Sequence, residues 1–165
     1  MQNLDGFRNH TMSVVVNNEP GVLAKLSGLI TRRGFNIESF SAGDTHEKNR
    51  FRLTVVVKGD DRGIEQVQKQ IYKMMDTVKV SPILDDAKID AETALIKIRA
   101  RNGEKLEFIQ LVKLHDGQIV DTAPEGFVVS IMGKTDTVNR FIRLFPTNRV
   151  VEIARTGVVA MSRWE

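Results

Sequence analysis

The chain has 165 residues, of which 41% are hydrophobic and 27% are charged, and its 24 basic and 21 acidic residues leave a net charge of +3. This composition is typical of globular domains and excludes a disordered chain. No apolar run reaches the roughly 18–20 residues that a membrane-spanning helix needs, and the polar first residues do not form a secretory signal. Cysteine is absent, so disulfides and thiolate metal sites are excluded, and we expect a cytoplasmic protein that does not enter a membrane.

The first half of the chain predicts the order strand, helix, strand, strand, helix, strand. Alternating apolar residues predict strands over 10–16, 36–42, 50–58 and 77–82. Apolar residues spaced by three and four predict two helices, one that starts near Gly21 and ends at Arg33, and one that follows Asp60.

The second half repeats this order, so the fold class is α+β with two βαββαβ domains. Strands are predicted over 93–100, 118–122, 127–132 and 149–154, and helices over 104–115 and 134–145. The acidic stretch between the halves is interpreted as a linker. The predicted domains are therefore residues 1–82 and 93–165, joined by the linker 83–92.

Each predicted domain has two helices for four strands, which cover only one face of the sheet. The other face would expose apolar side chains unless something packs on it. We therefore expect this face to be buried against the other domain or another copy of the chain, in a homodimer or a higher homo-oligomer.

No motif for catalysis is found. The three histidines are far apart in the sequence, and no metal-ligand spacing links them to carboxylates. The segment Gly133–Lys134–Thr135 ends like a phosphate-binding loop, but Val128 stands where that motif needs its first glycine. We expect a chain that is not an enzyme and binds no metal.

RNA binding is an alternative, because a common RNA-binding domain has the same element order. Residues 33–40 partly match its aromatic signature. The match fails at Asn36, Ile37 and Glu38, and the segment falls on the second strand rather than the third. We therefore expect no nucleic-acid partner.

The loop at residues 17–23 is the strongest signal for binding. It joins the first strand to a helix start, where free backbone N–H groups bind anions, and Gly21 lets a ligand approach closely. Asn36 begins the next strand and offers an amide donor and acceptor. Together they suit an amino acid, although an ordinary turn and strand entry explain the same spacing.

At these residues the chain resembles the ACT domain, a regulatory module for small ligands, and in particular the small regulatory subunits of acetolactate synthase. The similarity covers nearly the whole chain, from about His10 to Arg163, and the matching stretches comprise residues 18–23, 33–39, 65–70, 117–121 and 151–163. The resemblance implies two tandem ferredoxin-like domains, the first an ACT domain that pairs with another copy into an eight-stranded sheet. It also implies a valine site between the copies, formed by Asn18, Gly21 and Val22 of one and by Asn36 and Ile37 of the other.

The function implied by the resemblance is regulatory. The chain would activate the large catalytic subunit of acetolactate synthase and make it sensitive to feedback inhibition by valine, in the biosynthesis of branched-chain amino acids. Thiamine diphosphate, FAD and Mg²⁺ would belong to that catalytic subunit, with no cofactor in this chain. A stand-alone amino-acid sensor with the same ACT domain is the second alternative.

Overall fold

The computed structural model describes residues 7–101 and 103–164, which form two compact units. One unit is built from the chain up to Ile89 together with the residues from Val158 onward, and the other from Asp90–Gly157. Both units contain helices and strands in the predicted βαββαβ order, which confirms the α+β class and the two ferredoxin-like folds.

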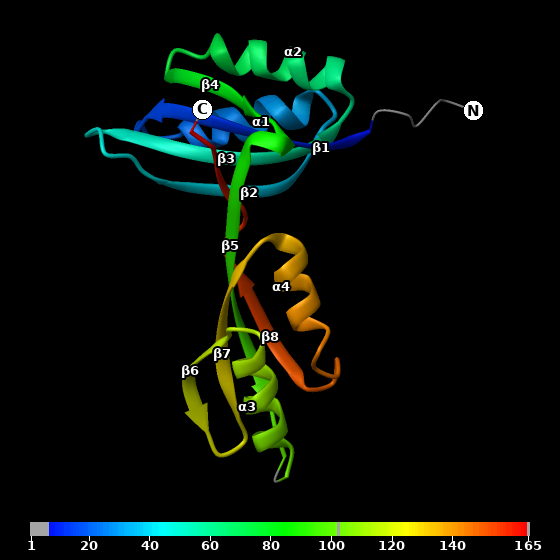
Figure 1. Cartoon of the computed structure of the whole chain (residues 1–165). Helices are drawn as coiled ribbons and strands as arrows, with labels where there is room; N and C mark the ends of the chain where they lie inside the picture. Colours follow the sequence, from blue (N-terminus) through cyan, green and yellow to red (C-terminus); the bar gives the residue numbers. More distant parts are fainter. Residues whose placement is uncertain (1–6, 102, 165) are drawn as a thin grey trace. The chain divides into compact units, whose positions relative to one another are not determined.

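The first unit has an antiparallel sheet with the strand order β2-β3-β1-β4, and both of its helices lie on one face of this sheet (Figure 1). Its elements are β1 (Arg8–Asn17), α1 (Val22–Arg32), β2 (Asn36–Asp44), β3 (Arg50–Gly59), α2 (Asp61–Tyr72) and β4 (Thr77–Ile83).

The core of the first unit follows from two periods in the sequence. Every second residue of β1 and β3 faces the helices, and residues spaced by three or four on α1 and α2 face the sheet. The buried set comprises Met12, Val14, Val16, Val22, Leu26, Ile30, Leu53, Val55, Val57, Ile64, Val67 and Ile71.

The second unit repeats this plan with the strand order β6-β7-β5-β8. Its elements are β5 (Lys88–Arg99), α3 (Glu104–Leu114), β6 (Gln118–Ala123), β7 (Gly126–Gly133), α4 (Thr135–Ile142) and β8 (Val150–Arg155), with β5 starting in the first unit. Aromatic rings fill this core: Phe145 makes edge-to-face contacts with Phe108 and Phe141 at centroid distances of 5.5 and 5.4 Å.

The structure corrects the expected linker 83–92. Ile83 ends β4, a single 3₁₀ turn covers Asp85–Ala87, and β5 begins at Lys88. Glu92 is not a solvated linker residue, because it is 4% exposed and pairs with Arg155. The acidic composition of this stretch suggested a loop, but the pairing of β5 with β7, which includes Glu92 and Gly133, keeps the chain extended, and Arg155 neutralises the buried carboxylate of Glu92.

The C-terminus corrects the expected domain 93–165. The last described residues, with β9 (Val159–Ser162), belong to the first unit and pack over β1 and β4. Val158 and Ala160 form a small buried cluster with Val56 and Ile83 on the sheet face away from the helices. Part of the face that we expected to be bare is therefore covered by the same chain.

Two side chains of the sheet bind the backbone of this C-terminal segment. The Val158 N–H donates to Ser39 Oγ at 2.8 Å, and the Ala160 N–H donates to Thr54 Oγ1 at 3.3 Å.

Within residues 7–101 and 103–164, no helix is long and apolar enough to cross a bilayer.

Candidate functional site

The loop between β1 and α1 is held at both ends by backbone hydrogen bonds. The Asn17 N–H donates to Asp76 O and the Asn18 N–H donates to Asn49 O, each at 2.8 Å. Gly21 then precedes the helix with φ of +83°, a left-handed conformation that favours glycine, and nothing lies within 4 Å of where a Cβ would stand. Gly21 therefore leaves open space beside the start of α1.

The start of α1 has backbone donors without acceptors. The Val22 N–H donates to Glu19 O at 3.2 Å and the Lys25 N–H donates to Gly21 O at 3.0 Å, while the Leu23 and Ala24 N–H groups have no acceptor in the described part of the chain. No acidic residue stands in the first turn, and no side chain caps it. The helix dipole and these two donors make this end favourable for an anion.

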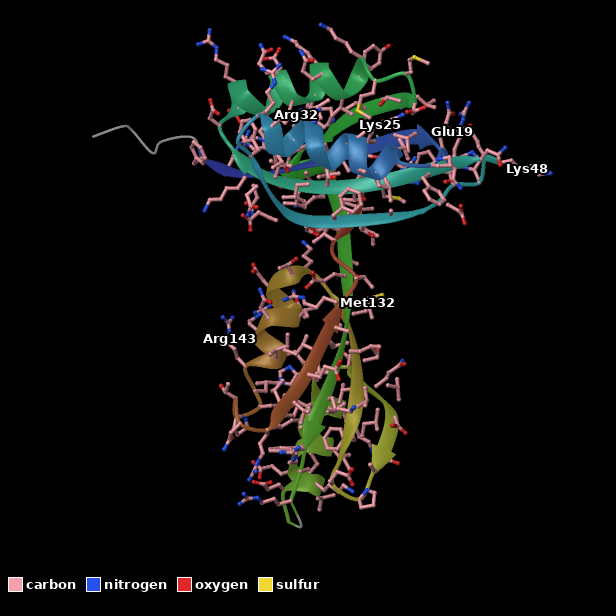
Figure 2. The ribbon with its side chains drawn as sticks, turned by 180° about the vertical axis from the view of Figure 1, so that it is seen from behind. Glu19, Lys25, Arg32, Lys48, Met132 and Arg143 are labelled. Carbon is pink, nitrogen blue, oxygen red and sulfur yellow. The ribbon has the colours of Figure 1, made fainter. Side chains whose placement is uncertain are left out.

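The charges around this helix start are partly neutralised. Lys25 Nζ donates to Asp76 Oδ2 at 2.9 Å. This ion pair neutralises the charge of Lys25, so the lysine is not a free cation for an anionic ligand. Figure 2 shows Glu19 and Lys25 toward this end of α1 and Arg32 at the opposite end. Glu19 and Lys25 have opposite charges, so these two side chains together add no net charge to this end of α1. Attraction of an anion therefore depends on the free backbone N–H groups.

Asn36 and Ile37 lie at the other end of the first unit. Asn36 begins β2 and pairs with Lys58, and its amide Nδ2 donates to Glu38 Oε1 at a long 3.4 Å. The 11-residue α1 separates this end from Gly21 by about 16 Å. Within one chain, the structure does not bring the two groups of predicted site residues together.

The predicted residues differ in what they could offer to a ligand. Asn36 is exposed, whereas the side chain of Val22 is 2% exposed and belongs to the core, so only its backbone faces the loop. Ile37 is half-buried and packs against the same core. Leu23, which was not among the predicted site residues, is 37% exposed next to the free N–H groups. Its place in the helical stripe indicated a core residue.

An ion pair lies near the Asn36 end of the sheet. Arg8, which pairs with Gly59 on β3, donates from Nη2 to Asp61 Oδ1 at 2.8 Å. This hydrogen bond, aided by the charge of Arg8, holds the pKa of Asp61 below its usual value. Both side chains are largely exposed, so they contribute charge to this end rather than a buried reactive group.

The described residues do not form a metal site or a stacking surface for RNA. No group of three or more potential metal-ligating side chains occurs among residues 7–101 and 103–164. On the face away from the helices, the middle strands present side chains without aromatic rings, namely Thr11, Ser13, Val15, Arg52, Thr54, Val56 and Lys58. RNA-binding domains of this topology need aromatic rings at these positions.

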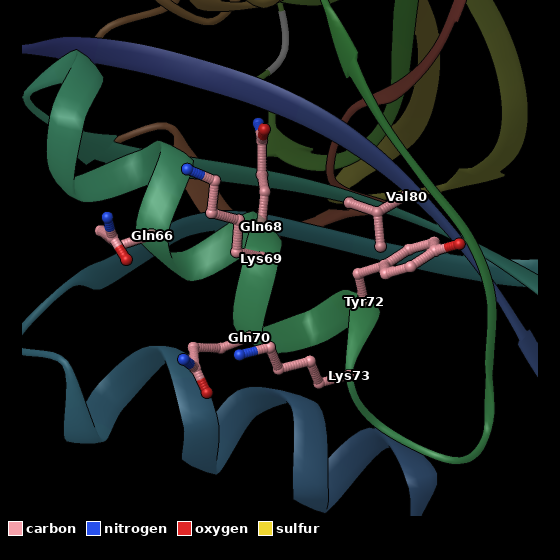
Figure 3. Close-up of a pocket in the computed structure, with 7 residues that line it drawn as sticks. All are labelled: Gln66, Gln68, Lys69, Gln70, Tyr72, Lys73 and Val80. Carbon is pink, nitrogen blue, oxygen red and sulfur yellow. The ribbon is translucent and has the colours of Figure 1, made fainter.

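A pocket over α2 is lined mainly by long polar and charged side chains (Figure 3). Tyr72 lies beside Val80, and the remaining lining consists of Gln66, Gln68, Lys69 and Gln70 on α2 and of Lys73, the residue that follows the helix. Tyr72 is 67% exposed, so the pocket has little enclosed apolar surface. The loop before α1 and the start of β2 are the candidate site because of the free backbone donors of α1 and the exposed amide of Asn36.

Comparison with known families matches both halves of the chain. Residues 12–79 match the family described as the ACT domain of the acetohydroxyacid synthase small subunit type, and residues 91–164 match the family described as the small subunit of acetolactate synthase. The two matches together cover most of the elements of both units, including β9.

Individual relatives agree with these families along nearly the whole chain. A probable acetolactate synthase small subunit of Archaeoglobus fulgidus is 42% identical and is aligned over 93% of this chain and 96% of its own length. The acetolactate synthase small subunit of Aquifex aeolicus is also 42% identical, over 94% of this chain and 82% of its own. The crystal structure of the Thermotoga maritima small subunit has a TM-score of 0.91, with 46% identity over 96% of this chain and 99% of that one. This chain belongs to the family of acetolactate synthase small subunits.

Proposed function

We propose that the protein is the regulatory subunit of an acetolactate synthase, which activates the large catalytic subunit and makes it sensitive to inhibition by valine. Membership of the small-subunit family supports a regulatory role beside a catalytic partner. In this proposal the chain is cytoplasmic and performs no catalysis, and thiamine diphosphate, FAD and Mg²⁺ are held by the catalytic subunit.

The observation that carries the valine site is the position of β2 at the edge of the first sheet (Figure 1). An edge strand has unpaired backbone groups that can pair with another chain. If β2 pairs antiparallel with β2 of a second copy, the Asn36 end of one strand meets the Asp44 end of the other.

The Asp44 end of β2 is also the end that carries the loop before α1. Asp44 pairs with Phe51, Phe51 pairs with Val16, and the Asn18 N–H binds Asn49 O. In an antiparallel dimer, the loop of one copy therefore approaches Asn36 of the other. This topology supports a site shared by two copies, from groups that one chain holds about 16 Å apart.

The donors and acceptors of this shared site match a zwitterionic amino acid. The Leu23 and Ala24 N–H groups of one copy would receive the carboxylate, and the amide oxygen of Asn36 from the other copy would accept from the ammonium group. The exposed part of Leu23 would contact the aliphatic side chain of valine. Binding across the dimer would link valine to the geometry of the two copies and hence to the catalytic subunit.

The test is Asn36→Ala in the complex with the catalytic subunit. We expect activation to stay at the wild-type level, while the valine concentration for half-inhibition rises at least about tenfold, a loss equivalent to about 1.4 kcal/mol of binding free energy. Inhibition curves and calorimetric titration of valine measure this effect.

The matched control is Asn9→Ala, because Asn9 is an exposed asparagine on β1 that pairs with the same Lys58. It should leave both activation and inhibition unchanged. An Asn36→Ala variant that is still inhibited at wild-type valine concentrations would refute the site, and a chain that activates no catalytic subunit would refute the regulatory function itself.

A further inference from the structure

A groove lies on the face of the first sheet away from the helices, beside the C-terminal segment. The sheet supplies Ser13, Val15, Ser81 and Ile83, and the segment after β9 supplies Arg163 and Trp164. The groove has a volume of about 510 Å³ and is also lined by Arg52, Lys79, Ile89, Met161 and Ser162. We call this set of residues the basic groove.

The strand register explains why the groove is basic. Val15 of β1 pairs with Arg52 on one side and with Lys79 on the other, so both cations rise from the same face. Arg52 and Lys79 lie on the two strands that flank β1, so two strand spacings of about 4.8 Å separate their Cβ atoms by roughly 10 Å. Arg163 adds a third cation at the rim.

These three cations have no carboxylate partner among the residues that the structure describes. None of Arg52, Lys79 and Arg163 forms an ion pair within 7–101 and 103–164, and no acidic residue from these ranges lines the groove. Three like charges around one groove attract an anionic partner and favour its encounter with this face.

Large apolar side chains are exposed at the same place. Trp164 is 98% exposed, Met161 is 55% exposed and Ile89 is 49% exposed. Tryptophan, methionine and arginine are enriched at protein interfaces, and tryptophan and arginine contribute most of the binding energy there. A partner that fits this surface combines negative charge with an apolar side chain.

We propose that the basic groove docks an acidic segment of the catalytic subunit that also presents an apolar side chain. This inference rests on the proposed function, because it names a surface through which that partner is bound. The groove has one exposed aromatic ring, whereas a single-stranded nucleic acid needs several stacking platforms. A second copy of the chain is already assigned to the edge of β2.

The experiment reverses the charge of the groove in the full chain and titrates it against the catalytic subunit of the same organism. Arg52→Glu with Lys79→Glu should raise the concentration for half-maximal activation at least tenfold. Both residues are exposed, so the fold should tolerate the change. The matched control is Arg62→Glu with Lys73→Glu, which makes the same charge change at exposed positions of the α2 region and should activate like the wild type.

Further measurements separate docking from folding. Valine binding by the isolated Arg52→Glu, Lys79→Glu variant should stay within twofold of the wild type, and the charge-conserving Arg52→Lys, Lys79→Arg variant should recover activation. Higher salt should weaken wild-type binding more than it weakens binding of the charge-reversed variant. Trp164→Ala should raise the half-maximal concentration without changing its salt dependence.

The proposal and the function on which it rests fail in different ways. If the wild type activates the catalytic subunit and the charge-reversed variant does so at the same concentration, the groove is not the docking surface. A variant that becomes monomeric shows that a second copy occupies the groove. Binding of oligo(U) that is lost in the variant while activation stays normal assigns the groove to nucleic acid. Each of these results overturns the proposal, whereas a wild type without any activation refutes the proposed function.

Discussion

At the scale of single residues, two glycines of the sheets differ in whether the surrounding structure leaves room for a side chain. A Cβ on Gly126 would stand 2.0 Å from the carbonyl oxygen of Ile98, a backbone atom that cannot move aside alone. A Cβ on Gly43 would meet no atom within 4 Å. Gly126 therefore allows β7 to pair closely with β5, whereas Gly43 has no such steric constraint in the chain.

Gly126→Ala should lower the free energy of unfolding of the second unit by about 3 kcal/mol, because the overpacked strand pair must separate. Gly43→Ala should change the stability of the first unit by less than about 0.5 kcal/mol. Hydrogen exchange of the β5 and β7 amides measures the first effect, since the single Trp and the single Tyr lie outside residues 90–157. Unchanged protection in Gly126→Ala would contradict the close approach.

At the scale of elements, the start of α3 depends on the carboxylate of Glu104. The Arg101 N–H donates to Glu104 Oε2 at 2.9 Å, and Arg149 Nη2 donates to Oε1 at 2.5 Å. The backbone hydrogen bond first, and the Arg149 side chain second, hold the pKa of Glu104 below its ordinary value of 4.5. This carboxylate ties the helix to the residue that precedes β8.

The lowered pKa of Glu104 predicts a pH dependence of the second unit. The stabilisation is fully present above the ordinary value of 4.5 and is lost as the pH falls from there through the lower folded-state pKa, because protonation neutralises the carboxylate that accepts both hydrogen bonds. Glu104→Gln should therefore be less stable than the wild type at neutral pH and should approach it under acid conditions. Urea unfolding followed by circular dichroism measures both curves, and a pH-independent difference would rule out this role.

At the scale of the whole molecule, the proposed valine site would need two chains to be complete. The loop with Gly21 and the strand entry with Asn36 lie at opposite ends of α1 in one chain. A second copy paired along β2 would bring them together. The oligomeric state and the regulatory function therefore depend on each other in this proposal.

Mixing two defective variants tests this dependence. Gly21→Asp places a negative charge beside the donors of α1 and requires a left-handed conformation that aspartate adopts less easily than glycine, while Asn36→Ala removes the amide. In a mixed dimer, one of the two sites has an intact loop and an intact Asn36. Calorimetry should find valine binding weakened at least about tenfold in either variant alone. After co-refolding in equal amounts, about a quarter of the wild-type number of sites should bind valine with wild-type affinity. No recovery on mixing would show that the site does not combine the two chains in this way.

The order of the elements could be predicted from the sequence because the spacing of apolar residues within each short segment determines whether it forms a helix or a strand. The three-and-four spacing from Val22 to Ile30 and the alternation along β3 each report which face is buried, so the predicted ranges agree with α1 and β3 to within about two residues. The loop at Gly21 was recognisable for the same reason, since its turn residues are adjacent in the chain. Asn36 was recognisable as a strand entry, but its distance from Gly21 depends on the path of α1.

Only the tertiary structure decided what the remaining segments do. Residues 158–162 carry too short a pattern to predict a strand, and β9 is stabilised by Ser39 and Thr54, more than 100 residues earlier in the chain. Residues 83–92 read as a linker because their acidic side chains are adjacent in sequence, yet Glu92 is buried by pairing with Arg155. The basic groove also depends on contacts between distant residues. The strand register places Arg52 and Lys79 beside Val15, and the C-terminal segment, which packs back on the first sheet, adds Arg163. Local periodicity thus determined the elements, whereas contacts between distant residues decided the domain boundaries and the surfaces available to partners.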